Sequence, residues 1–214
     1  MSVHEHVIMP DENEEKSMLK RYQHGVGSLL YLVKLSLPDL TNSVRELSKC
    51  MTKCNRDSYN QMLRVISYLK MYNNYGIKLK WNQKMNENID LKCYVDSDWG
   101  GDTVNRKSIS GWIITFNGNP IVWTSKQQSI VAQSSSEAEY IATSDSCKDV
   151  VFVIRILDFF GFKINFPVKI MVDNKGAIFM TMNSSIKKTK HIHTRYLFVK
   201  EYIDNGIVDV EYIK

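Results

Sequence analysis

The sequence of 214 residues has no long apolar run, and its first residues, MSVHEHVIMPDENEEK, mix acidic with apolar side chains. A membrane-spanning helix needs about 20 apolar residues in succession. A secretory signal needs a basic start followed by an apolar stretch. We therefore expect no membrane partner and a protein that stays inside the cell.

Cysteine is also scarce. The four thiols are too few and too scattered for a disulfide framework, and a C-x3-C pair without a second ligand pair is a poor zinc signal. We expect all of them to be reduced: Cys50, Cys54, Cys93 and Cys147.

The net charge of +5 is modest, but basic residues gather near the C-terminus at Lys187, Lys188, Lys190, Arg195 and Lys200. Such a cluster suits a polyanion. A basic run is, however, more often simply a solvated face.

The first part of the chain divides in two. Residues 1–20 lack hydrophobic periodicity and are predicted to be disordered. Residues 21–85 carry a helical pattern from Val26 to Tyr72, which predicts three short helices with Pro38 in the first turn of the second and Asp57 or Ser58 capping the third. Turn-forming residues at positions 73–76 mark the change to extended structure.

Residues 90–214 read as an α/β domain. Leu91, Cys93 and Val95 alternate with polar residues, and strands at 111–117 and 120–125 flank the hairpin turn Asn117-Gly118-Asn119. Helices at 136–148 and 150–160, a strand at 168–172, helices at 175–183 and 193–204, and a strand at 207–213 follow. This order predicts a mixed five-stranded sheet flanked by helices, with three antiparallel strands first and parallel strands later.

Three carboxylates fall where such a fold brings side chains together. Asp96 ends the first strand, Glu139 lies in the first turn of the following helix, and Asp173 ends the fourth strand. Converging acids repel one another unless divalent cations neutralise them. Two Mg²⁺ ions, roughly 3.5–4 Å apart, are the expected occupants, and Mn²⁺ could replace them.

Each acid also has a purely structural interpretation. Asp96 could cap a strand end, Glu139 could complete a capping box with Ser136, and Asp173 could cap the next helix. A calcium loop is a further alternative, since Asp96, Asp98 and Gly101 occupy EF-hand positions 1, 3 and 6. Position 5 is Gly100 and position 12 is Lys107, so the carboxylate count fails.

Taken together, several blocks resemble one family. YVDSDWGGD, KSISGWIITFNGNPIVWTSKQQSIVAQSSSEAEYIA, VDNKGA and KTKHIHTRYLFVKEYIDNG are similar to the ribonuclease H domain of copia-type retrotransposon polyproteins. The match covers residues 91–213, and the upstream YQHGVGSLLYLVKLSLPDLTNSVRELSK resembles the connection segment that joins the reverse transcriptase to that domain. The resemblance implies a ribonuclease H-like fold.

The resemblance also implies functional residues. Asp96 and Asp173 correspond to the family's first and third metal ligands, and Glu139 to its helix glutamate, in the frame A-E-Y-I-A, with Glu137 as the competing candidate. Substrate contacts are implied for Ser135, Ser136 and Asn174, although helix capping would suit them equally. His191 and His193 are candidates for contact with phosphate, with a surface structural role as the alternative.

The implied activity is cleavage of the RNA strand of an RNA/DNA hybrid, without a small-molecule cofactor. The family's fourth carboxylate is expected in a further helix beyond Lys214, so a catalytically impaired remnant that only binds nucleic acid is the alternative. An integrase has its acids in the order Asp, Asp, Glu, which differs from this chain. No Y-x-D-D motif is present, so we expect no DNA synthesis. A polymerase portion is an expected partner, and the expected location is the cytoplasm, a virus-like particle or the nucleus.

Overall fold

The computed structural model describes residues 12–80, 88–182 and 190–214. The chain forms two compact units, Met1–Ile77 and Lys78–Lys214. The division falls directly after the turn-forming residues at positions 73–76. Each unit has its own hydrophobic core.

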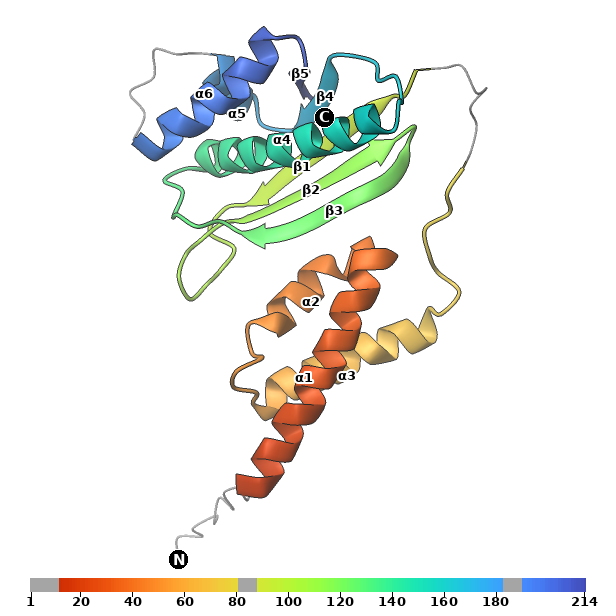
Figure 1. The fold of residues 1–214 in the computed structure, drawn as a ribbon. Helices are drawn as coiled ribbons and strands as arrows, with labels where there is room; N and C mark the ends of the chain where they lie inside the picture. The colour runs from red at the N-terminus through yellow and green to blue at the C-terminus, as the bar shows by residue number, and fades with distance from the viewer. Residues whose placement is uncertain (1–11, 81–87, 183–189) are drawn as a thin grey trace, which may run out of the picture. The chain divides into compact units, whose positions relative to one another are not determined.

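The first unit is helical. It contains α1 (Glu12–Leu35), a short 3-10 helix η1 (Pro38–Leu40), α2 (Thr41–Ser48) and α3 (Arg56–Met71) (Figure 1). Buried side chains recur along α1 every three or four residues, which places them on one face of the helix: Tyr22, Val26, Leu29 and Val33. The Tyr22 hydroxyl donates a hydrogen bond to the carbonyl oxygen of Leu47 at 2.6 Å, so it is satisfied within this core.

Three expectations for this unit need correction. The prediction of disorder is wrong for residues 12–20, which are helical, while residues 1–11 lie outside the described residues. Acidic side chains in the first turn of α1 favour the helix through its dipole, and Lys16 forms an ion pair with Glu12. The third helix is capped by Asn55, with Ser58 completing the capping box, and Pro38 lies in η1 just before α2.

The second unit contains a mixed five-stranded sheet. Its strands are β1 (Leu91–Asp98), β2 (Ile109–Phe116), β3 (Asn119–Gln127), β4 (Val168–Val172) and β5 (Val208–Tyr212), in the order β3-β2-β1-β4-β5. The β1–β2 and β2–β3 pairs are antiparallel, whereas β1–β4 and β4–β5 are parallel. The sequence-based expectation of antiparallel strands followed by parallel ones is confirmed.

The β2–β3 hairpin has the turn that its sequence predicts. Asn117 and Gly118 both have positive φ, at 49° and 78°. Two such residues form the turn that matches the twist of antiparallel strands, and asparagine and glycine adopt this backbone region most readily.

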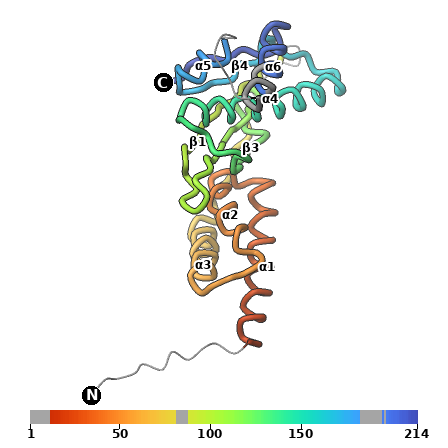
Figure 2. The backbone as a smooth tube through the Cα atoms, turned by 90° about the vertical axis from the view of Figure 1, so that its left-hand side faces the viewer, coloured from red at the N-terminus to blue at the C-terminus, as the bar shows by residue number. Residues whose placement is uncertain are grey.

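The helices of this unit are α4 (Ser135–Phe159), α5 (Lys175–Met182) and α6 (Lys190–Asp204). Residues 135–159 form one helix of 25 residues, so the expectation of two helices was wrong. No glycine or proline interrupts this stretch, so no residue in it ends the helix. Figures 1 and 2 both show α4 lying along the sheet, with α5 and α6 beside it.

The core of this unit lies between α4 and the sheet. Leu91, Cys93 and Val95 alternate along β1 with more exposed residues, and they pack in one cluster with Ala138 and Ile141 of α4. In the described part of the chain, no helix combines the length and the apolar composition that crossing a membrane requires.

Candidate active site

The pairing of β1 with β4 places two of the three predicted acids side by side. Val95 is paired with Val172 in the parallel register, and Asp96 and Asp173 are the next residues of each chain segment. Both carboxylates are exposed, while the two valines are buried. Two acids far apart in sequence are therefore neighbours at one end of the sheet.

The third acid comes from α4. Glu139 is only 5% exposed, and its Oε1 accepts hydrogen bonds from both the backbone N and the Oγ of Ser97, each at 2.8 Å. Its other oxygen, Oε2, is buried and has no hydrogen-bond partner among the described residues. A buried carboxylate oxygen without a partner is costly, so this atom is a candidate ligand for a bound cation.

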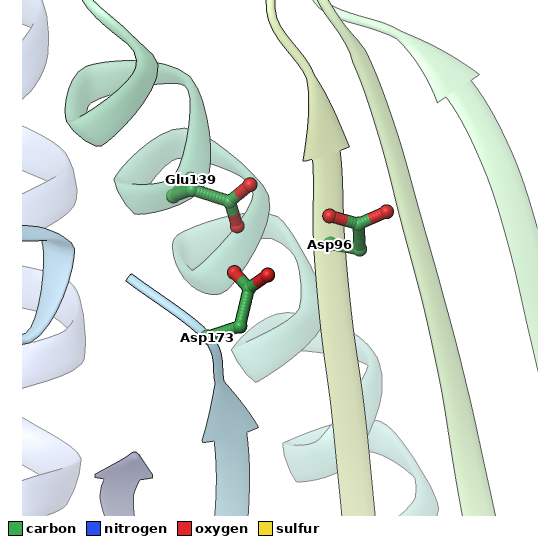
Figure 3. A group of neighbouring side chains, drawn as sticks. All are labelled: Asp96, Glu139 and Asp173. Carbon is green, nitrogen blue, oxygen red and sulfur yellow. The ribbon is translucent and has the colours of Figure 1, made fainter. Parts of the chain in front are cut away.

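The three carboxylates form one group. Each offers an oxygen, and these oxygens lie within 4.8 Å of one another. Figure 3 shows Glu139 and Asp173 facing each other, with Asp96 opposite them on β1. The expected convergence is therefore observed.

The electrostatics of the group raise the pKa of Glu139 to about 7. Burial is the largest cause, because it disfavours the charged form, and the neighbouring Asp96 and Asp173 act in the same direction. The two hydrogen bonds from Ser97 oppose this shift. A cation beside Oε2 would favour the charged form.

Residues other than the three acids cap the helices of this region. Ser134 is the N-cap of α4 and accepts from the backbone N of Glu137, whose own Oε2 accepts from the backbone N of Gln133 at 2.8 Å. The suggestion that Glu139 forms a capping box with Ser136 is therefore wrong. Glu139 also lies in the second turn of α4, since the helix begins at Ser135.

At the N-terminus of α5, too, the capping residue is a neighbour of the acid and not Asp173 itself. Asn174, the next residue, accepts a hydrogen bond from the backbone N of Ala177 at 3.0 Å and so caps α5. A helix-capping role for Asp173 is therefore wrong. The calcium-loop alternative also fails, because Asp96 and Asp98 both lie in β1 and not in a loop.

The candidate substrate-binding residues lie next to the carboxylates. The Oγ of Ser136 is 3.2 Å from Oδ1 of Asn174, which joins the N-termini of α4 and α5. A Cβ added at Gly176 would lie 2.4 Å from that Oγ, so the close approach of the two helices requires glycine there. Ser135 is exposed in the first turn of α4.

The histidine candidates and part of the basic cluster belong to the segment around the start of α6. The backbone of His191 and His193 belongs to α6, but their side chains lie outside the described residues, as do Lys187 and Lys188. Arg195 is described, and its Nη1 lies 2.6 Å from Oδ1 of Asp145 in α4. This ion pair fixes the start of α6 against α4.

Two residues of this unit whose contacts hold the site or its helices, Ser97 and Asp145, were not predicted from the sequence. Ser97 was read only as part of YVDSDWGGD, because no spacing rule links a strand residue to a glutamate 42 positions later. Asp145 was likewise not singled out, and its partner Arg195 was treated only as one member of a basic cluster. Both contacts depend on how α4 packs, which local patterns do not encode.

The strand order, the two parallel pairs and the helix layer of the second unit agree with the ribonuclease H-like fold that the resemblance implied. No family model matches the sequence. The retrovirus-related Pol polyprotein from transposon RE2 of Arabidopsis thaliana is 32% identical over 214 residues, which is 100% of this chain and 14% of that relative. The corresponding polyprotein from transposon TNT 1-94 of Nicotiana tabacum is 32% identical over 206 residues, 95% of this chain and 15% of the relative.

Among solved structures, the chain is similar to LC11-RNase H1 in complex with an RNA/DNA hybrid, at 14% identity and a TM-score of 0.41. That match covers 57% of this chain and 83% of the other. Nearly the whole chain is therefore homologous to retrovirus-related Pol polyproteins of transposons. It spans 14% to 15% of the length of the two relatives named above.

Proposed function

We propose that the second unit is a divalent-cation-dependent ribonuclease H that hydrolyses the RNA strand of an RNA/DNA hybrid. The observation that carries this proposal is the meeting of Asp96, Glu139 and Asp173, with oxygens within 4.8 Å and Glu139 Oε2 buried without a partner. Three carboxylates so close together repel a phosphodiester unless their charge is neutralised. They would hold Mg²⁺ or Mn²⁺, since oxygen ligands suit these hard cations.

Bound divalent cations would supply a water activated for attack and stabilise the leaving oxygen of the phosphodiester, as in other nucleases with two metal ions. The protein's part is to fix the ligands. Asp96 and Asp173 are fixed by the parallel register of β1 and β4, and Glu139 by α4 and by Ser97. Cleavage would leave a 3′-hydroxyl and a 5′-phosphate.

Recognition of the hybrid is proposed to use the polar groups at the N-termini of α4 and α5. Ser135, Ser136 and Asn174 carry short polar side chains that can hydrogen-bond 2′-hydroxyl groups in the wide minor groove of the hybrid. His191 and His193 remain candidates for phosphate contact. Within a polyprotein, the helical unit would connect this nuclease to the polymerase portion.

The proposal is tested with the full chain, a labelled RNA/DNA hybrid, and Mg²⁺ or Mn²⁺. Asp96→Asn serves as the matched variant, and single-stranded RNA and duplex DNA serve as substrate controls. We expect hybrid-specific cleavage that is lost in Asp96→Asn, while binding of the hybrid is kept or strengthened because one negative charge is removed. Full activity in Asp96→Asn would overturn the site, and binding without cleavage by the folded wild-type chain would overturn the activity.

A further inference from the structure

The two oxygens of the Glu139 carboxylate have different surroundings. Oε1 accepts two hydrogen bonds from a single residue, Ser97, one from the backbone N and one from the side-chain Oγ, each at 2.8 Å. Oε2 is buried and lacks a partner among the described residues. One oxygen is thus saturated, and the other remains available.

The position of Ser97 makes this arrangement specific. Ser97 follows Asp96 directly on β1, so one short strand segment supplies one carboxylate of the site and the two donors that hold another. A hydrogen bond to a charged acceptor is stronger than one between neutral groups, and two donors on one oxygen also fix the rotation of the carboxylate. The Glu139 side chain therefore has its orientation set by β1 although it belongs to α4.

From this geometry we infer that Ser97 is a positioning residue for the cation site. Its hydroxyl holds Oε1 of Glu139 in place and leaves the buried Oε2 as the single, fixed oxygen that can serve as a ligand. The inference rests on the proposed cation-dependent function and adds to it a residue that touches neither the cation nor the substrate. Groups that orient metal ligands in this way typically contribute 10- to 100-fold to metal affinity or activity.

The test measures cation binding directly. Mn²⁺ is titrated into the full chain, and free Mn²⁺ is quantified by electron paramagnetic resonance, for wild type, Ser97→Ala and Ser97→Thr. Because alanine keeps the backbone donor and loses only the hydroxyl, we expect Ser97→Ala to weaken Mn²⁺ binding by roughly 10-fold, the lower end of that range. Ser97→Thr retains a hydroxyl and should restore affinity to within about twofold of wild type, on the same reasoning.

Two controls separate positioning from a general loss of stability. Ser146→Ala removes another hydroxyl of the same unit. That hydroxyl donates to the carbonyl oxygen of Thr143 and does not contact the carboxylates, so the Mn²⁺ affinity of Ser146→Ala should equal that of wild type. Ser97→Ala should have no further effect in a Glu139→Gln background, because the hydroxyl acts through that carboxylate. Melting in EDTA verifies that each variant is folded.

The outcomes distinguish this inference from the proposed function. If wild type binds Mn²⁺, Asp96→Asn does not, and Ser97→Ala binds as wild type does, the cation site stands and the role of Ser97 is refuted. Additive effects of Ser97→Ala and Glu139→Gln would also refute it. If folded wild type binds no Mn²⁺, both the proposed function and the inference fail.

Discussion

Glu137 and Glu139 lie two residues apart in α4, yet the first caps the helix by accepting from the backbone N of Gln133 and the second points at Asp96 and Asp173. Two residues along a helix correspond to a rotation of about 200°, so the two side chains leave on nearly opposite sides. This relationship favours Glu139 over Glu137 as the helix glutamate of the proposed site.

Substituting Glu137 and Glu139 one at a time should separate an effect on stability from an effect on cleavage. Glu137→Ala removes one capping hydrogen bond and should lower the free energy of unfolding by about 0.5–1 kcal/mol, with cleavage of the hybrid retained. Glu139→Gln should abolish cleavage and keep the fold, since glutamine has the same shape without the charge. Cleavage assays and denaturant unfolding measure the two effects, and loss of cleavage in folded Glu137→Ala would contradict the assignment.

The raised pKa of Glu139 predicts a pH-dependent stability. Its pKa is about 7 in the folded chain against 4.5 for the unperturbed group, with burial as the main cause. The folded state then holds a proton that the unfolded state releases, so this stabilising contribution is complete below about pH 4.5 and is lost as pH rises through about 7. The loss is on the order of 3 kcal/mol.

This effect can be isolated by comparing wild type with Glu139→Gln in EDTA between pH 5 and pH 8. Residues 1–77 contain no tryptophan, so tryptophan fluorescence follows the unfolding of the second unit alone. Wild type should lose stability relative to the variant as pH rises, and added Mg²⁺ should recover the loss in wild type only. If the free energy of unfolding of the two proteins changed with pH in parallel, the pKa of Glu139 would not be raised in the folded chain.

Gly176→Ala should damage the junction between α4 and α5. The new Cβ would lie 2.4 Å from Oγ of Ser136 and 3.0 Å from Oδ1 of Asn174, so both polar groups would have to move. We expect a loss of roughly 1–3 kcal/mol in the free energy of unfolding, by the cost of overpacking, and weaker cleavage.

Gly27→Ala is the matched control for that substitution. Gly27 also lies in a helix, and a Cβ there meets nothing within 4 Å, so alanine should stabilise α1 by about 0.5–1 kcal/mol. Circular dichroism follows its effect, because the tryptophans report only on the other unit. If Gly176→Ala and Gly27→Ala changed the free energy of unfolding equally, the contact at Gly176 would not contribute to stability.

Arg195→Ala should loosen α6 from α4. Arg195 and Asp145 are 18% and 15% exposed, and the hydrogen bonds from Lys148 and Arg195 outweigh burial and lower the pKa of Asp145. Loss of this largely buried pair should cost roughly 1–3 kcal/mol, less than a fully buried pair because Lys148 remains. Lys148→Ala, which removes a half-exposed partner, should cost about 1 kcal/mol or less. Tryptophan fluorescence during urea unfolding compares the two, and equal losses would refute the role of Arg195.

Much of the domain was determined by local sequence. Alternation at Leu91, Cys93 and Val95 indicated β1, and Asn117-Gly118 indicated the hairpin. The expected strand ends at Asp96 and Asp173 indicated one edge of the sheet, although β1 continues to Asp98. These features depend on backbone preference and on the two-residue period of strands, which a short window of sequence contains. The helix start at Glu12 was missed because acidic residues in a first turn carry no hydrophobic pattern.

Only the tertiary structure decided which side chains cap the helices and which face one another at the site. Sequence favoured Glu139 with Glu137 as the competing candidate, gave a capping role to Ser136 instead of Ser134, and was silent on Ser97. The physical reason is that these roles depend on the rotation of α4 against β1 and on the exact register of β1 with β4. That register and rotation arise from packing between segments more than 40 residues apart, as in the 42-residue separation of Ser97 and Glu139.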